Sequence, residues 1–332
     1  HVNHPPPFLP VFSTTHCIAQ YMALRTGICT ALNQETLDKL KVAGIKKVTD
    51  FLAKDPELLS HDIHIAYKDV CSIRRVLLAE HSAYPVSAAR LYQNALSSLT
   101  ILPTGCQNLD DLLDGGLYTG EVTELAGESA SGKTRLCLWS AASTILTENQ
   151  SVVYIDTCAS FSPECVLESL PLDKDSNSDV SEDKIHEMLQ KIRCVELFEI
   201  FELFAVIDNI MSDLNKPSPD EYRNLKLVIV DNLVSVVYPI MGGNIRLCQG
   251  LISQLGMKLK ELAVSHSLAI LLTNNLTSSF NGSKRKPALG KAWSHVPHTR
   301  LLLQRPMGVS CHQNSQREAC LVKSSRQVTL NL

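Results

Sequence analysis

The chain has 332 residues, of which 45 % are hydrophobic and 20 % are charged, and its formal net charge is −3 at pH 7. This apolar content excludes a mainly disordered chain, and no apolar run reaches the roughly 20 residues that a membrane-spanning helix needs. The 11 cysteines contain no Cys-x-x-Cys pair, which argues against a zinc ribbon or a disulfide scaffold and predicts reduced thiols in a nuclear or cytosolic protein.

The length predicts two domains, at roughly 100–200 residues per domain. Charge is distributed unevenly between the parts of the chain. Residues 161–225 contain 15 acidic and 6 basic side chains, whereas residues 276–332 contain 9 lysines and arginines and a single glutamate. Such asymmetry indicates that one surface meets a polyanion.

The first part of the chain predicts an extension followed by a small all-α domain. Residues 1–21 contain three consecutive prolines and no helix signal, so we expect them to be disordered or not to belong to the natural protein. Residues 22–80 contain short helical patterns. Asn33 predicts an N-cap, and apolar residues follow it at helical spacing, at Leu37, Leu40 and Val42. The Leu-x-x-x-Gly-Ile turn at 40–45 fits either a helix-hairpin-helix that contacts DNA phosphates or an ordinary helix connection.

Residues 81–103 are predicted to form a linker, because they contain Pro85 and several small residues. In this stretch Tyr84 is an aromatic residue followed by the small residue Ala88. Two interpretations remain open. Tyr84 and Ala88 dock into a neighbouring subunit, or Tyr84 folds back on its own domain.

Residues 104–332 predict an α/β domain. Four short apolar runs, at 122–126, 152–156, 225–230 and 268–273, are separated by helical stretches. Such near-continuous apolar runs are typical of parallel strands that are buried on both faces. The sequence therefore predicts a mainly parallel sheet with helices packed against it.

A glycine-rich loop lies between the first apolar run and a helical stretch. It matches G-x-x-x-x-G-K-[ST] at every fixed position, with Gly127, Glu128, Ser129, Ala130, Ser131, Gly132, Lys133 and Thr134. The backbone N–H groups of such a loop and the N-terminus of the next helix bind phosphates. The motif predicts a nucleotide site in which Lys133 reaches the β- and γ-phosphates and the Thr134 hydroxyl binds Mg²⁺.

Asp231 comes directly after the third apolar run. In nucleotide-binding folds of this kind, a carboxylate at this strand end holds Mg²⁺. We therefore predict that Asp231 is the second magnesium-binding residue. The alternative is that Asp231 caps the following helix.

A basic loop follows the fourth apolar run. It contains four cations, Lys284, Arg285, Lys286 and Lys291. Flexible positive charge suits contact with a nucleic-acid backbone, so these residues are predicted to bind DNA; the alternative is a solvated loop. Trp293 either stacks on a base or belongs to the core. His295 and His298 are expected to be structural.

The assembled motifs resemble those of the eukaryotic RecA-type recombinases. Besides the phosphate loop, the similar stretches are residues 117–124, 154–157, 163–164, 272–275 and 299–301. Within that family the chain is most similar to the D paralogue group, at residues 74–79, 286–294 and 323–327. The resemblance covers residues 22–327.

The resemblance implies a RecA-like P-loop ATPase core behind the helical domain, with ATP and Mg²⁺ as cofactors and a role in homologous-recombination repair in the nucleus. It implies that loops at 238–246 and 276–292 bind single-stranded or branched DNA. It also implies a hetero-oligomer with other recombinase paralogues, in which the C paralogue pairs through the core and a smaller paralogue through the N-terminal region. Because the family continues through another strand or two, we expect that the chain ending at Leu332 is a truncated or an alternative product.

Three positions depart from the pattern of active recombinases. Cys158 stands where the family has the glutamate that polarises the attacking water, Cys165 replaces an arginine near the adenine, and Asn275 replaces a longer glutamine that senses the γ-phosphate. We therefore expect an assembly subunit with slow ATP hydrolysis. The alternative is an active DNA-dependent ATPase that exchanges strands. An unrelated P-loop kinase or transporter ATPase is a third alternative, but the sequence has no lid or ABC-type signature and the basic loop would be unexplained.

Overall fold

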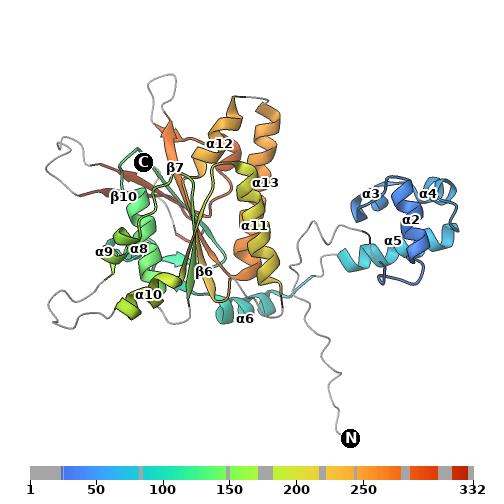
Figure 1. Cartoon of the computed structure of the whole chain (residues 1–332), viewed down its shortest axis with the longest axis horizontal. Helices are drawn as coiled ribbons and strands as arrows, with labels where there is room; N and C mark the ends of the chain where they lie inside the picture. The colour runs from blue at the N-terminus through green and yellow to red at the C-terminus, as the bar shows by residue number, and fades with distance from the viewer. Residues whose placement is uncertain are drawn as a thin grey trace, which may run out of the picture. The chain divides into compact units, whose positions relative to one another are not determined.

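The computed structural model describes residues 24, 26–81, 85–146, 150–170, 182–216, 222–242, 245–277, 285–305 and 316–327. The chain forms two compact units, residues 1–95 and 96–332 (Figure 1). The expected tail at 1–21 lies outside the described residues. No helix in the described ranges combines the length and the apolar character that crossing a bilayer requires.

The first unit is a small group of helices. They are α2 (Gln34–Val42), α3 (Val48–Ala53), α4 (Pro56–Asp62) and α5 (Tyr67–His81). The predicted N-cap is confirmed, because the Asn33 side chain accepts a hydrogen bond from the Thr36 backbone N–H at 2.9 Å. Asp55 caps α4 in the same way, through the N–H groups of the second and third residues after it. The caps satisfy backbone donors that have no partner inside the helix.

One face of each of these helices forms the core of the first unit. The buried side chains include Leu37, Leu40, Val48, Phe51, Leu59, Ile73 and Leu77. Val42 lies in α2, as its helical spacing predicted, but it does not join this core and is 90 % exposed. Val42 lies two residues beyond Leu40, about 200° around the helix, and therefore on the opposite face. After α2 the chain turns at Gly44, whose φ is +77°.

The second unit is built on an eight-stranded sheet with the order β10-β9-β3-β7-β6-β4-β5, and β8 pairs with β7. The strands are β3 (Val122–Gly127), β4 (Ser151–Asp156), β5 (Ile192–Glu196), β6 (Leu225–Asp231), β7 (Ala269–Thr277), β8 (Lys286–Pro287), β9 (Thr299–Gln304) and β10 (Glu318–Lys323). The pairs β9–β10 and β7–β8 are antiparallel, and the other neighbours run parallel. The four apolar runs become β3, β4, β6 and β7, so the predicted mainly parallel sheet is confirmed.

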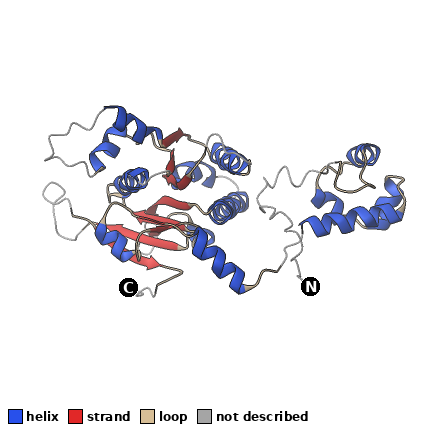
Figure 2. Ribbon diagram, turned by 90° about the horizontal axis from the view of Figure 1, so that it is seen from below, coloured by secondary structure: helices blue, strands red, loops and turns tan. Residues whose placement is uncertain are grey.

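Helices lie on both sides of this sheet (Figures 1 and 2). They are α7 (Gln107–Leu112), α8 (Lys133–Leu146), α9 (Pro163–Ser169), α10 (Glu182–Gln190), α11 (Ile200–Leu214), α12 (Leu233–Met241), α13 (Ile245–His266) and α14 (Gly290–Trp293). Successive strand residues point to opposite faces. Ile229 accordingly packs in the core under α8, and Val228 packs in the core under α11 and α13. The predicted α/β class is confirmed.

The stretch predicted to be a linker contains a helix, α6 (Ala88–Ser98). After it, β1 (Ile101–Leu102) pairs antiparallel with β2 (Leu117–Tyr118). None of the residues of α6, all of which the structure describes, is buried. Pro85 and the small residues of this stretch predicted a linker, and the helical spacing of the apolar residues that follow them was not used.

Candidate nucleotide-binding site

The glycine-rich loop joins β3 to α8 at the carboxyl end of the parallel strands. Gly132 has a φ of +100°, a left-handed conformation that glycine adopts without steric cost. At Gly127 a Cβ would lie 2.9 Å from the Leu303 carbonyl oxygen and would also meet the Ser131 hydroxyl. Both fixed glycines of the motif are therefore needed for the loop to turn tightly onto the N-terminus of α8.

Lys133 begins α8 and folds back on the loop. Its ammonium donates hydrogen bonds to the carbonyl oxygens of Gly127, at 2.9 Å, and Glu128, at 2.8 Å. Burial lowers the pKa of Lys133, and the negative charge of Asp231 opposes that shift. The cation is thus held at the floor of the site by the carbonyl groups of the loop.

Asp231 ends β6, and its side chain is 3 % exposed. Its carboxylate accepts hydrogen bonds from the Tyr154 hydroxyl at 3.0 Å and from the Thr273 hydroxyl at 2.5 Å. Burial is the main cause that raises the pKa of Tyr154, so the phenol keeps its proton and remains a donor. The alternative role of helix cap is wrong for Asp231, because Asn232 caps α12 through the Val234 N–H at 2.9 Å.

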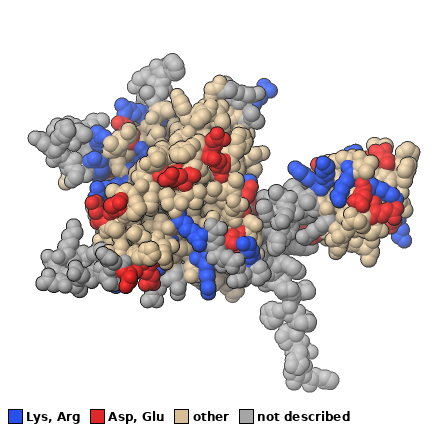
Figure 3. All heavy atoms as spheres, viewed as in Figure 1, with Lys and Arg blue, Asp and Glu red and all other residues tan. Residues whose placement is uncertain are grey.

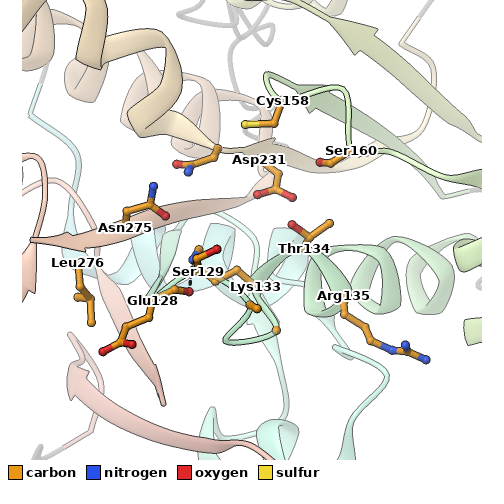
Figure 4. Close-up of a pocket in the computed structure, with 13 residues that line it drawn as sticks. Glu128, Ser129, Lys133, Thr134, Arg135, Cys158, Ser160, Asp231, Asn275 and Leu276 are labelled. Carbon is orange, nitrogen blue, oxygen red and sulfur yellow. Dashed lines mark hydrogen bonds between the residues drawn. The ribbon is translucent and has the colours of Figure 1, made fainter. Parts of the chain in front are cut away.

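These groups meet in one pocket of about 560 Å³ (Figure 4). It is lined by the loop residues Glu128–Ala130 and Gly132–Arg135, by Cys158 and Ser160 after β4, by Asp231 and Asn232 after β6, and by Asn275 and Leu276 at the end of β7. In Figure 4 the Thr134 side chain points toward the Asp231 carboxylate. The two residues predicted to bind magnesium therefore face the same space.

A tight turn after β4 places Cys158 in this pocket. Asp156 is fully buried and accepts hydrogen bonds from the backbone N–H groups of Cys158 at 2.9 Å, Ser160 at 2.7 Å and Phe161 at 2.6 Å. Its carboxylate is thereby used to hold the turn. Cys158 itself is exposed, and its thiol occupies the wall of the pocket where the resemblance implies a glutamate in active relatives.

The two other departures lie in different places. Asn275 lines the pocket, and its carbonyl accepts a hydrogen bond from the Ala288 N–H at 2.9 Å. Cys165 lies in α9, is exposed and is not among the residues that line the pocket. Of these two positions, only Asn275 therefore contributes to the wall of the pocket that the described residues form.

The described members of the predicted DNA-binding set lie in different local surroundings. Lys284 lies outside the described residues. Arg285 forms an ion pair with Glu128 of the phosphate loop, Lys286 pairs with Thr277 in the β7–β8 ladder, and Lys291 lies exposed in α14. In the view of Figure 3, several basic side chains lie along one edge of the second unit.

Trp293 belongs to the core, so of the two interpretations left open for it the core one is confirmed. Its side chain is 1 % exposed, and its indole N–H donates to the carboxylate of Glu124 at 2.8 Å. Asn274 donates to the same carboxylate oxygen at 2.6 Å, and Arg300 pairs with the other. His298 is structural as expected, since its Nδ1 accepts a hydrogen bond from the Val122 N–H at 2.9 Å.

The residues predicted for partner docking are only partly described. Tyr84 lies outside the described residues, and Ala88 is the exposed first residue of α6. Three apolar side chains of this helix escaped the sequence analysis, namely Leu91, Tyr92 and Leu96, which are 56 %, 66 % and 67 % exposed. Their helical spacing is the signal that could have shown them.

Tyr154 and Thr273, which hold Asp231, were also missed. Each is a polar residue within one of the predicted apolar runs, 152–156 and 268–273, and each is fully buried. A buried polar side chain requires a hydrogen-bond partner, so these two residues are recognisable as members of an internal network. Their common partner, however, becomes evident only when the strands are placed side by side.

Comparison with known proteins gives consistent matches along the chain. The family model described as Rad51 matches residues 96–328, and the model described as RAD51D, N-terminal domain, matches residues 22–80. The DNA repair protein RAD51 homolog 4 of Mus musculus is 39 % identical over 306 residues, which cover 92 % of this chain and 92 % of that protein. The DNA repair protein RAD51 homolog 2 of Homo sapiens is 27 % identical over 89 % of this chain and 82 % of its own length. The DNA repair and recombination protein RadA of Aeropyrum pernix is 26 % identical over 82 % of this chain and 84 % of its own length.

Proposed function

Because this chain belongs to the Rad51 family, we propose that it is an ATP- and single-stranded-DNA-binding recombinase paralogue that assists homologous-recombination repair of DNA breaks in the nucleus. The matches to the RAD51D N-terminal domain and to the mouse homolog 4 agree with the resemblance to the D paralogue group. The observation that carries the proposal is the pocket that brings together the phosphate loop, Lys133, Thr134 and Asp231.

The residues of this pocket fit a nucleoside triphosphate with Mg²⁺. The Ser131 hydroxyl is buried and has no hydrogen-bond partner among the described residues, and a Cβ at Gly127 would collide with it. Lys133 would hold the β- and γ-phosphates, and the loop N–H groups would orient them. Thr134 and Asp231 offer the oxygen ligands that a hard cation prefers. When bound, Mg²⁺ would supply positive charge that neutralises the phosphates.

The pocket favours binding of ATP over its rapid hydrolysis. Asp156 is already committed to three backbone N–H groups, and Cys158 offers a thiol on the wall of the pocket. A thiol is a poor substitute for the carboxylate that orients and deprotonates water. We therefore propose slow hydrolysis, with ATP serving mainly to stabilise contacts between subunits. An active DNA-dependent ATPase that exchanges strands is the alternative.

Phosphate release from ATP tests this proposal. The chain would be measured with and without single-stranded DNA, and Lys133→Ala, purified in parallel, would serve as the blank. We expect nucleotide binding that depends on Lys133, with phosphate release close to the blank. Strong DNA-stimulated release above the blank would favour the strand-exchange alternative. Nucleotide binding that does not depend on Lys133 would contradict the nucleotide site itself.

We propose that single-stranded or branched DNA contacts the basic residues Lys284, Arg285, Lys286 and Lys291. Three of them lie within the described residues, and their positive charge supports contact with phosphates. The loop at 238–246 is the second proposed DNA contact. Tyr238, at its start, is 72 % exposed, which supports access to this segment.

We further propose that the chain works as a hetero-oligomer, with the C paralogue bound through the core and a smaller paralogue bound through the N-terminal region. Tyr84 and Ala88 are the proposed docking residues. Tyr84→Ala is expected to reduce co-purification of a co-expressed paralogue without lowering the unfolding temperature. Tyr92→Ala, which removes another exposed aromatic from the same stretch, is the control. Co-purification that survives Tyr84→Ala but not Tyr92→Ala would reassign the docking residue.

A further inference from the structure

The carboxylate of Asp231 is held from both sides by hydroxyl groups. Asp231 lies at the end of β6, and the neighbours of β6 in the sheet are β4 and β7. Tyr154 of β4 donates to one carboxylate oxygen at 3.0 Å, and Thr273 of β7 donates to the other at 2.5 Å. Both donors are fully buried, so water cannot replace the bonds that they make.

We infer that Tyr154 and Thr273 are the positioning residues of the magnesium site, which orient the Asp231 carboxylate toward Thr134. The inference rests on the proposed nucleotide site, because it assigns a role to residues behind the predicted metal-binding pair. In Figure 4 the carboxylate and the Thr134 side chain face each other across the pocket. Neither Tyr154 nor Thr273 lines that pocket, so both would act through Asp231.

The hydrogen bonds limit the orientation of the carboxylate. An ionised carboxylate offers about four acceptor positions, two on each oxygen. One position on each oxygen of Asp231 is taken by a hydroxyl, and the remaining positions are left for a ligand in the pocket. Rotation of the carboxylate would break both bonds and leave two buried hydroxyl groups without an acceptor, which is unfavourable. The site is therefore preorganised before a ligand arrives.

Tyr154 is itself fixed by its surroundings. Its ring packs against Phe161, with the ring centroids 4.9 Å apart. The backbone N–H of Phe161 is in turn held by the buried Asp156 at 2.6 Å. The turn that carries Cys158 and the orientation of Asp231 are thus parts of one hydrogen-bonded and packed unit.

Two conservative substitutions separate positioning from simple stabilisation. Tyr154→Phe removes one hydroxyl and keeps the ring, and Thr273→Val removes the other and keeps the branched shape. Thr273→Ser retains the donor and serves as the rescue variant. Tyr118→Phe is the matched control, because the Tyr118 hydroxyl donates to a backbone carbonyl, that of Asp114, at 2.7 Å and does not line the pocket.

The measurement is binding of a fluorescent ATP analogue, mant-ATP, in EDTA and at increasing MgCl₂ concentrations, with urea unfolding of each variant alongside. Tyr154→Phe and Thr273→Val are expected to raise the half-saturating Mg²⁺ concentration about tenfold, the lower end of the effect of removing residues that orient a metal ligand. Binding in EDTA is expected to stay at the wild-type level in both variants. Thr273→Ser and Tyr118→Phe are expected to keep the wild-type Mg²⁺ dependence.

Each outcome decides between the possible roles. If Tyr154→Phe and Thr273→Val lower the urea midpoint but keep the wild-type Mg²⁺ dependence, the hydroxyls only stabilise the fold and the inference is overturned. If Tyr154→Phe does not fold, the comparison of Thr273→Val with Thr273→Ser decides. A wild-type chain that binds mant-ATP equally with and without Mg²⁺ overturns the inference but leaves the nucleotide site intact. A wild-type chain that shows no Lys133-dependent binding overturns the proposed function and this inference together.

Discussion

Arg285 forms an ion pair with Glu128, so that a cation predicted to bind DNA contacts the phosphate loop. The Arg285 and Glu128 side chains are 57 % and 52 % exposed, so water and dissolved salt weaken the attraction between them. The next residue, Lys286, lies in β8, which is paired with β7. The base of the basic loop is therefore attached to the strand that carries Asn275 into the nucleotide pocket.

Glu128→Gln is expected to increase the affinity for single-stranded DNA in the absence of nucleotide, because Arg285 loses a competing partner. The increase should be at most about fivefold, since an exposed ion pair contributes about 0–1 kcal/mol. Fluorescence anisotropy with labelled oligonucleotide measures it. The double variant Glu128→Gln, Arg285→Gln should lose the gain, and a gain that persists in it would show that Arg285 is not the residue released.

Replacing Lys284, Arg285 and Lys286 with alanine is expected to weaken single-stranded DNA binding and to flatten its dependence on salt. For every cation that binds a phosphate, its removal should reduce the slope of log K against log [salt] by about 0.7. Affinity measured over a range of KCl concentrations gives the slope. Lys184→Ala, at an exposed position of α10, is the control, and an identical slope in both variants would remove the basic loop from the DNA site.

Cys158→Glu is expected to raise DNA-stimulated phosphate release, because it places a carboxylate at the wall of the pocket. General acid–base groups typically contribute 10²–10⁴-fold to a rate, so a gain of at least about tenfold is expected. The control variant Cys158→Gln introduces a side chain of the same length as glutamate but without its charge, and it should leave the rate of phosphate release unchanged. Equal rates in the two variants would mean that another feature of the pocket limits hydrolysis.

Trp293→Phe is expected to destabilise the second unit by about 2–3 kcal/mol, because it removes a hydrogen bond to the buried carboxylate of Glu124. Urea unfolding measures the change, and Trp139→Phe, at a half-buried indole on α8, is the comparison. DNA affinity of the folded protein should be unaltered, since Trp293 is buried. A decrease in DNA affinity at unchanged stability would restore the base-stacking interpretation.

Acid is expected to destabilise the chain through His298. Burial, with Lys260 and Lys323 nearby, lowers the pKa of His298, and its Nδ1 must be unprotonated to accept the Val122 N–H. At this residue the unfolded chain therefore binds a proton more readily than the folded chain does. The stability is full above the usual histidine pKa of about 6.5, and it falls as the pH drops through that value toward the lowered pKa of the folded state. Unfolding midpoints at pH 7.5 and 5.5 should differ less in His298→Asn, which keeps an acceptor but does not titrate. If the unfolding midpoint decreases equally in the wild-type chain and in His298→Asn, titratable groups other than His298 cause the loss of stability.

The sequence by itself determined the features that depend on neighbouring residues. The phosphate loop at 127–134 is contiguous, and its two fixed glycines are required by the backbone that they form. Asn33 reaches an N–H only three residues away. The four apolar runs became buried parallel strands, because a strand covered on both faces cannot carry polar side chains without internal partners. Edge strands such as β5 mix exposed and half-buried positions and gave no such pattern.

Only the tertiary structure decided which distant residues meet. Trp293 and Glu124 are 169 positions apart, and no local spacing distinguishes an indole that stacks on a base from one that donates to a buried carboxylate. The same holds for Asp231, whose donors come from the strands on either side of β6. Periodicity assigns a residue to a face of a strand or helix, whereas sheet order and packing select the residue opposite it. The chemistry of this site depends on which distant residues the sheet order and the packing bring together.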